Sequence, residues 1–204
     1  MTLILGSSSP YRLQLLREAG VEPTIIKPDL DENIVKNDNA SKTPVFIAQI
    51  LARLKSENVE SKIKDLTEYI IIGSDQVCVF NNQILNKPGN FENNLNQLLK
   101  LQGQTHSLIT AVCLIYKRLQ DTESHQIHFY NQTDLHMKPL TADEIKIYLQ
   151  EDEPFDCAGG YKFELNGRAL MDKITSTDLS AIQGLPIIET LKHLEAIGYQ
   201  TKLN

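Results

Sequence analysis

The feature that most constrains the fold is an apolar segment in the middle of the chain, residues 69–80. Its first part, Tyr69–Ile72, is rich in β-branched side chains and is typical of a strand buried on both faces of a sheet. Gly73 begins a short polar break and permits a tight bend. We therefore expect Asp75 at the end of this strand, at the rim of the sheet where α/β proteins usually bind ligands. A carboxylate there requires a cation, a charged partner or water; the alternative is that Asp75 only forms a turn or caps a helix.

The N-terminal segment reads as a strand at Leu3–Leu5, a small-residue loop and a helix closed by Gly20. Ser9 suits the helix N-cap and Pro10 suits the first helical position. Free backbone N–H groups at such a start favour an anion, commonly phosphate, and Arg12 can add a bidentate contact. The loop lacks the Gly and Lys pattern of a P-loop, so a plain helix cap is the alternative.

Three further charged residues are candidates for a polyphosphate or metal site. Glu32 lies in an acidic cluster after a short predicted strand, Thr24–Lys27, where a solvated loop is the alternative. Lys55 follows the apolar stripe of the second predicted helix, although most lysines in such places extend to water. Lys87 is held among turn residues, which can place it near the expected position of Asp75.

A small-residue loop at residues 154–164 permits a close approach of the backbone to a ligand. The loop supplies two charged side chains, Lys162 and Glu164. We expect Lys162 to contact the substrate; a mobile loop without a ligand contact is the alternative that the composition leaves open.

The second half of the chain predicts a long antiparallel hairpin from residues 106–116 and 126–137. A capping box at Thr141–Glu144 opens a helix, and a last helix follows Leu185-Pro186 and ends at Gly198. These patterns predict an α/β fold: a mixed twisted sheet with a long antiparallel hairpin and helices on both faces. Other turn and cap signals are Thr43-Pro44, Asn81-Asn82 and Asn90.

Length and composition limit the classes of function. With 204 residues, 41% of them hydrophobic and 23% charged, the chain fits one domain, residues 1–204. The formal net charge of −6 and the lack of a basic run argue against a nucleic-acid polymer as partner; a small nucleotide needs few cations. No apolar run approaches the ~20 residues of a membrane span, and the start lacks the basic flank of a secretory signal. Three cysteines without a CxxC pair predict reduced thiols in a cytoplasmic protein.

Together the candidates combine a strand-end carboxylate, a second acidic site, dispersed cations and a phosphate-type helix start. Cations neutralise phosphate oxygens, a divalent ion can bridge them, and a carboxylate can position or deprotonate water. The pattern indicates metal-assisted chemistry on a polyphosphate. No Ser-His-Asp order, zinc cluster or dinucleotide fingerprint in the sequence competes with it.

Several short motifs match one protein family in both order and spacing: Ser7–Arg12, Asp31-Glu32, Lys55, Gly73–Val77, Lys87-Pro88, Ala158-Gly159 and Gly184–Pro186. With these motifs the chain resembles the Maf family of nucleoside triphosphate pyrophosphatases along nearly its whole length. The resemblance implies hydrolysis of a nucleoside triphosphate to the monophosphate and pyrophosphate, with Mg²⁺ or Mn²⁺. It also implies one bilobed domain with a cleft between two lobes, and a homodimer. It makes Asp75 the proton acceptor and places Asp75 and Glu32 at the metal. The residues it assigns to the substrate phosphates are Ser9, Arg12, Glu32, Lys55 and Lys87.

Within the family, Ile71–Val79, the aromatic Tyr11 and Glu164 are similar to the 7-methyl-GTP pyrophosphatase branch. The dTTP/UTP branch usually has Arg and Gln in place of Tyr11 and Glu164. The resemblance makes Tyr11, Gln76 and Glu164 the specificity positions. N7-methylguanine has a positive ring charge, so stacking on Tyr11 adds a cation–π attraction of roughly 0.5–2 kcal/mol. Glu164 can accept hydrogen bonds from the guanine N1–H and exocyclic amine, and its negative charge attracts the positive ring.

Two positions depart from the family pattern. Asn86 stands where a Gly usually precedes the Lys87-Pro88 pair, and Leu13 stands where this branch often has a second Arg. Asn tolerates a left-handed backbone, so the turn can survive, whereas Leu13 removes a peripheral phosphate contact.

Two rival functions stay open: a pyrophosphatase for dTTP, UTP or another non-standard nucleotide, and a nucleotide-binding regulator of cell division.

Overall fold

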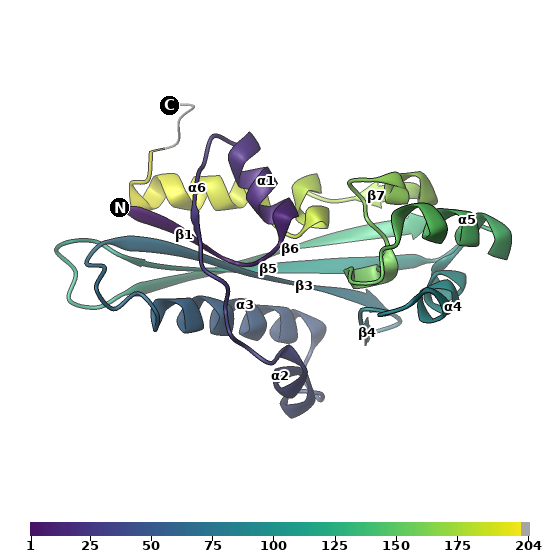
Figure 1. The fold of residues 1–204 in the computed structure, drawn as a ribbon, viewed down its shortest axis with the longest axis horizontal. Coiled ribbons are helices and arrows are strands. Elements are labelled where there is room, and N and C mark those ends of the chain that lie inside the picture. Colours follow the sequence, from purple (N-terminus) through teal and green to yellow (C-terminus); the bar gives the residue numbers. More distant parts are fainter. Residues whose placement is uncertain (201–204) are drawn as a thin grey trace.

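The computed structural model describes residues 1–200, and a mixed sheet of seven strands lies at their centre (Figure 1). The strands are β1 (Thr2–Gly6), β2 (Thr24–Ile25), β3 (Tyr69–Phe80), β4 (Gln83–Leu85), β5 (Thr105–Lys117), β6 (His125–Met137) and β7 (Met171–Thr175). Their order is β2-β1-β3-β5-β6-β7, and β4 pairs with β3. β1 is parallel to β2 and β3, and the other pairs are antiparallel. The mixed sheet and the long β5–β6 hairpin are confirmed; residues 201–204 of the predicted domain lie outside the described residues.

Helices cover both faces of this sheet, as expected (Figure 1). The α-helices are α1 (Pro10–Glu18), α2 (Glu32–Asp38), α3 (Pro44–Glu60), α4 (Phe91–Leu101), α5 (Ala142–Asp152) and α6 (Ile187–Ile197). Short 3₁₀ helices are η1 (Ala158–Gly160), η2 (Asn166–Leu170) and η3 (Leu179–Gln183). α3 lies on one face, α1 and α6 lie on the other, and α4 and α5 lie together near β4 and β7 (Figure 1). The division into two lobes stays a prediction. Within residues 1–200, no helix combines the length and the apolar character needed to cross a bilayer.

The alternating side chains of β3 join the two helical layers through the sheet. Ile71 belongs to the apolar cluster that contains Leu51 of α3. Ile70 and Ile72 belong to the cluster on the opposite face, together with Leu16 of α1. Side chains alternate between the two faces of a strand, so the continuous apolar run is required for a strand that is covered on both faces.

Local signals for turns and caps are largely confirmed. Asn81 and Asn82 connect β3 to β4 with φ angles of 50° and 62°, the left-handed conformation that a two-residue hairpin turn requires. Side chains of Ser9, Thr43, Asn90 and Thr141 accept hydrogen bonds from the first turns of α1, α3, α4 and α5, and Glu144 completes the capping box.

The predicted bend at Gly73 is wrong, because β3 runs unbroken through this residue. Gly73 instead lies directly under α3. A β-carbon at this position would overlap Ser56 Oγ and would lie 2.5 Å from the carbonyl oxygen of Ala52. The glycine therefore permits the close approach of helix and strand, and the strand needs no bend.

We expect Gly73→Ala to lower the free energy of unfolding by about 1–3 kcal/mol, the usual cost of overpacking a core. Gly6→Ala is the matched control. Gly6 pairs with Gly73 and lies under the same helix, but an added β-carbon would come no closer than 3.2 Å to its nearest neighbour, the Val59 side chain. Urea denaturation of both variants checks the expectation, and equal losses would contradict the role of the α3 contact.

α2 was not expected, since its residues were predicted to be an acidic loop. Asp31 caps this helix by accepting hydrogen bonds from Asn33 N and Ile34 N. The only apolar residues of α2 are the adjacent Ile34 and Val35, so no periodic apolar stripe marks this helix in the sequence. β2 is also shorter than the predicted strand Thr24–Lys27.

Candidate active site

The candidate site lies where β3 lacks a neighbour on one edge. β1 pairs with β3 as far as Gly6 opposite Gly73, and β4 pairs with it from Cys78 onwards. Asp75 and Gln76 lie between these limits, and a cavity of about 400 Å³ opens beside them. The predicted position of Asp75 at the end of its strand is therefore wrong. Asp75 lies within the strand, and the rim is created by the earlier end of β1.

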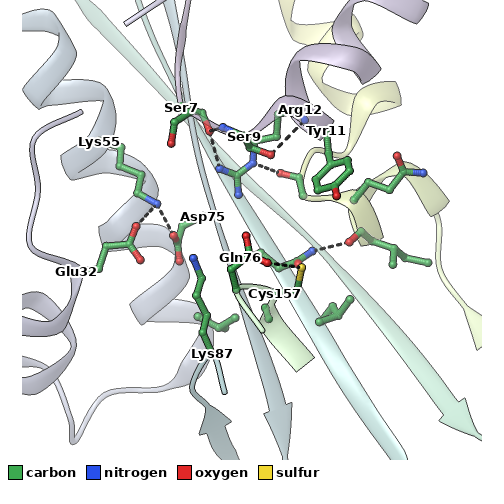
Figure 2. A pocket seen from close by; sticks show the side chains of 18 of the residues that line it. Ser7, Ser9, Tyr11, Arg12, Glu32, Lys55, Asp75, Gln76, Lys87 and Cys157 are labelled. Atoms are coloured by element: carbon green, nitrogen blue, oxygen red, sulfur yellow. Dashed lines mark hydrogen bonds and ion pairs between the residues drawn. The ribbon is translucent and has the colours of Figure 1, made fainter. Parts of the chain in front are cut away.

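A lysine joins two carboxylates on the α3 side of the cavity. Lys55 Nζ lies 2.6 Å from Asp75 Oδ1 and 2.7 Å from Glu32 Oε1 (Figure 2). Asp75 is 4% exposed and Lys55 8% exposed. Asp75 Oδ2 is buried and has no hydrogen-bond partner within the described part of the chain. A buried carboxylate oxygen without a partner is costly, so this atom marks a place where a ligand can bind.

Glu32 carries its charge because several cations surround it. Burial acts to raise its pKa, but the charge and hydrogen bond of Lys55, followed by the charges of Lys87 and Lys36, outweigh this effect. The pKa of Glu32 therefore lies below its usual value. The exposed Lys87 lines the cavity and extends toward Asp75 (Figure 2), so Asn86 does not prevent the expected placement of Lys87.

The loop between β1 and α1 forms another wall of the cavity. Ser9 Oγ accepts a hydrogen bond from Arg12 N, which caps α1 at its first turn. The buried Ser7 Oγ accepts hydrogen bonds from Ser9 N at 3.1 Å and from Arg12 Nη1 at 3.1 Å. Arg12 Nε also donates to the carbonyl oxygen of Gly184 at 2.7 Å. The guanidinium is thus held by two segments far apart in the sequence.

Arg12 is the cation of this wall. Burial lowers the pKa of its guanidinium, and the nearby charges of Asp75 and Glu32 partly offset this effect. The pKa of a free arginine is so high that the group stays charged in proteins. Helix N–H groups and a fixed guanidinium are groups that can bind an anion.

Tyr11 and Glu164 both line the cavity. Burial, followed by the influence of the nearby Glu164 carboxylate, raises the pKa of Tyr11 to about 12. The phenol is therefore protonated at neutral pH and is available as a donor. The two predicted specificity residues thus lie near each other, which the sequence did not indicate.

Gln76, the third predicted specificity residue, is fixed by its amide nitrogen. Nε2 donates to Thr110 Oγ1 at 2.8 Å and to the carbonyl oxygens of Ala181 at 2.8 Å and Ile182 at 3.1 Å. Thr110 Oγ1 itself donates to the Ala181 carbonyl. The side-chain amide therefore has one defined orientation at the cavity wall.

The structure does not bring Lys162 into the cavity. Its ammonium group donates to the backbone carbonyl of Asp152 at 2.9 Å, and its backbone N–H donates to the Tyr148 hydroxyl. Its neighbours Tyr161 and Phe163 line the cavity. The chain is extended near this residue, so adjacent side chains point in different directions, and the expected substrate contact of Lys162 is not supported.

Sequence reasoning missed Lys36, which lines the cavity from α2. Lys36 is one helical turn after Glu32, the spacing at which a Glu and a Lys share a helix face. Recognising Asp31 as an N-cap would have predicted this helix and its shared face. The carbonyl groups that hold Arg12 and Gln76 were also missed, because backbone acceptors have no sequence signature.

Asp75 and Glu32 fit a divalent cation as a pair of oxygen donors. Within residues 1–200, no group of three or more His, Cys, Asp or Glu side chains could hold a metal ion by itself. Mg²⁺ typically binds one or two carboxylates together with substrate phosphates. The unpartnered Asp75 Oδ2, close to the Lys55-linked Glu32, meets this requirement when a polyphosphate supplies the other ligands.

Comparison with known proteins identifies the family. The model of Maf-like proteins matches residues 2–197. The 7-methyl-GTP pyrophosphatase of Bdellovibrio bacteriovorus is 39% identical over 193 residues, which cover 95% of each chain. Proteins of the same name from Burkholderia orbicola and Nitrosococcus oceani are each 36% identical, over 97% of this chain and 90% and 94% of their own. The extent of both matches shows that this chain belongs to the Maf-like protein family.

Proposed function

We propose that this chain hydrolyses 7-methyl-GTP to 7-methyl-GMP and pyrophosphate, and thereby removes a modified nucleotide. The observation that carries the proposal is the buried Asp75, with one oxygen on Lys55 and the other without a partner at the wall of a cavity. The names of its relatives support the same activity.

In the proposed reaction Asp75 is the general base. Its Oδ2 accepts a proton from the attacking water as the water oxygen bonds to the α-phosphorus. The bond from the α-phosphorus to the bridging oxygen breaks, and pyrophosphate leaves with the electron pair. Lys55 holds the other carboxylate oxygen at 2.6 Å, which fixes Asp75 in position before the proton arrives.

Arg12, Lys87 and the N-terminus of α1 are the proposed contacts of the phosphates. The guanidinium is half-buried and is fixed by Ser7 and Gly184, so the side chain loses little conformational entropy when it binds a phosphate. Lys87 is exposed, so its ammonium group can move to neutralise the negative charge of the leaving pyrophosphate. Lys55 is already bonded to two carboxylates, so we assign it mainly to charge neutralisation.

Glu32 and the Asp75 carboxylate, which has lone pairs besides the one that accepts the proton, would hold the divalent cation, Mg²⁺ or Mn²⁺. When bound, such an ion neutralises phosphate oxygens and lowers the cost of the negative charge that develops on the leaving group. The depressed pKa of Glu32 keeps it ionised for this role at neutral pH.

Tyr11 and Glu164 are the proposed contacts of the base. Both residues line the same cavity, and the Glu164 carboxylate lies near the Tyr11 ring. A carboxylate has several lone pairs for the guanine edge, and its negative charge attracts a methylated, positively charged base that stacks on Tyr11.

A homodimer and a cytoplasmic location stay predictions.

A panel of triphosphates at equal concentration, with pyrophosphate detection in Mg²⁺ or Mn²⁺, tests the function. We expect 7-methyl-GTP to exceed GTP in kcat/KM by about tenfold, the equivalent of about 1.4 kcal/mol of cation–π and charge attraction. Glu164→Gln is expected to remove most of this preference, whereas Glu151→Gln on the exposed surface of α5 is the matched control.

Other outcomes of the panel identify the rivals. A preference for dTTP or UTP would replace the proposed substrate and disprove the base contacts. Nucleotide binding without release of pyrophosphate would instead favour a regulator.

A further inference from the structure

The segment between β7 and α6 supplies backbone carbonyls that hold the cavity side chains. The Gly184 carbonyl accepts from Arg12 Nε at 2.7 Å and from Ser74 Oγ at 2.9 Å. The carbonyls of Ala181 and Ile182 accept from Gln76 Nε2. The orientations of a phosphate-binding and a base-selecting side chain therefore depend on one stretch of backbone, η3 and Gly184.

Asp178 holds this stretch in place, although it lies outside the cavity lining. The side chain is 7% exposed. Oδ1 accepts from the N–H and the hydroxyl of Ser180, and Oδ2 accepts from Ile188 N at 2.8 Å. The two oxygens thus connect the start of η3 to the first turn of α6, and η3 and Gly184 lie between the two connections.

The donors that face the Asp178 carboxylate are two backbone N–H groups and the Ser180 hydroxyl. Among residues 1–200, no Lys, Arg or His side chain forms an ion pair with it. Pro186 at the start of α6 provides no side-chain cap, so Asp178 satisfies a free N–H of that helix and meets the positive end of its dipole. Charge-assisted hydrogen bonds of this kind are about twice as strong as neutral ones, which suits a residue that must hold a loop rigidly.

The loop also passes very close to the guanidinium. Gly184 has a φ of 99°, and a β-carbon on it would lie 3.1 Å from Arg12 Nε. A small displacement of this backbone would therefore move both the carbonyl acceptor and the steric wall of Arg12. The geometry leaves little freedom between the loop position and the guanidinium position.

We propose that Asp178 is a positioning residue that sets Arg12 and Gln76 together, and so links phosphate binding to base selection in the proposed reaction. The inference rests on the proposed function, because it assigns Arg12 to the phosphates and Gln76 to the base. Asp178 touches neither substrate nor reacting atoms; it acts through the carbonyls of Ala181, Ile182 and Gly184.

Asp178→Asn tests the proposal, because the amide keeps the shape but places an N–H group or a weaker acceptor opposite Ser180 and Ile188. We expect KM for 7-methyl-GTP to rise about tenfold, the effect of one weakened charge-assisted hydrogen bond, with kcat changed by less than about threefold. We expect the preference for 7-methyl-GTP over GTP to fall severalfold in the same variant. Calorimetric titration with pyrophosphate should show weaker binding, because Arg12 is displaced.

Thr141→Ala is the control for a merely structural role. It removes the capping box of α5, outside the cavity lining, and a lost cap usually lowers stability by about 1 kcal/mol. We expect it to lower Tm without a change in KM or in base preference. An Asp178→Asn protein with a lower Tm but wild-type KM, base preference and pyrophosphate affinity would overturn the proposal.

Ser180→Ala provides a second, milder variant if Asp178→Asn fails to fold. Ser180 Oγ accepts from Ile187 N at 2.8 Å and donates to Asp178, so its loss weakens the same connection. A rise in KM and a loss of base preference support the proposal, and unchanged values overturn it.

Failure of the proposed function gives a different result. The wild-type protein would then hydrolyse no triphosphate, but the affinities of the wild type and of Asp178→Asn for pyrophosphate would still show whether Asp178 positions Arg12. Absence of pyrophosphate binding in the wild type would overturn the role of Asp178 as well.

Discussion

Asp75→Asn is expected to reduce pyrophosphate release from 7-methyl-GTP by about 10³-fold, within the range for loss of a general base. The amide has the same shape and can still accept a hydrogen bond from Lys55 through its oxygen, so the fold is retained. It cannot take a proton from water, and a neutral amide is a much weaker ligand for a divalent cation. Initial rates of pyrophosphate release and thermal unfolding of the same preparation measure the two effects.

Asp134→Asn is the matched control for this variant. Asp134 is a half-buried carboxylate on β6 that accepts from Ser107 Oγ at 2.7 Å, and it does not line the cavity. Its replacement should leave the rate within about threefold of wild type, as surface changes away from a site have small effects. A near-wild-type rate for Asp75→Asn would remove Asp75 from the mechanism.

Lys55→Gln is expected to have the second largest effect, lowering both turnover and stability. Without the ammonium group, Asp75 and Glu32 face each other as like charges in a largely buried site, and one of them must bind a proton. We expect turnover to fall by about 10²-fold, because a protonated Asp75 cannot act as the base. Loss of one partner from a buried pair costs about 3 kcal/mol, which corresponds to a decrease in Tm of roughly 6–12 °C for a chain of this size.

The stability loss of Lys55→Gln should depend on pH in a defined direction. The pKa of Glu32 is lower in the folded protein than its usual value, and after the opposing effect of burial the main cause is Lys55. The stabilisation from this pair is therefore fully present above the unfolded-state pKa of about 4.3 and is lost as pH falls through the depressed folded-state pKa. The difference in unfolding free energy between wild type and variant should be large at pH 7 and should shrink below about pH 4.3.

Urea denaturation at pH 7 and in the acidic range measures this difference. Arg53→Gln is the control on the same helix, because its pair with Glu57 is exposed and 3.7 Å long and such pairs contribute roughly 0.3–0.5 kcal/mol. A stability difference for Lys55→Gln that stays constant or grows toward acidic pH would contradict the proposed arrangement of charges.

Much of the fold was predictable, because its signals are local. Ser9 caps α1 and the Asn81-Asn82 pair turns β3 into β4, and both effects depend on residues a few positions apart. The apolar run of β3 indicated a strand covered on both faces, since each of its side chains must be buried. The same reasoning failed at α2, because its only apolar residues are the adjacent Ile34 and Val35, which form no helical period.

The residue types of the candidate site were also predictable, but their geometry was not. The resemblance identified Asp75, Arg12 and Lys87, and each of them lines the cavity. Three features depend on how distant segments pack: the proximity of Tyr11 and Glu164, the direction of Lys162 away from the cavity, and the gap between β1 and β4 beside Asp75.

The sequence by itself determined the elements of the sheet, most of the helix starts and the family of the protein, because capping, periodicity and motif spacing are properties of neighbouring residues. The tertiary structure decided where the site opens. β1 ends at Gly6 while β3 continues, and this difference in strand length exposes Asp75 to the cavity. It also decided how Arg12 and Gln76 are held, since their acceptors are backbone carbonyls from the other end of the chain, and every residue type has such a group.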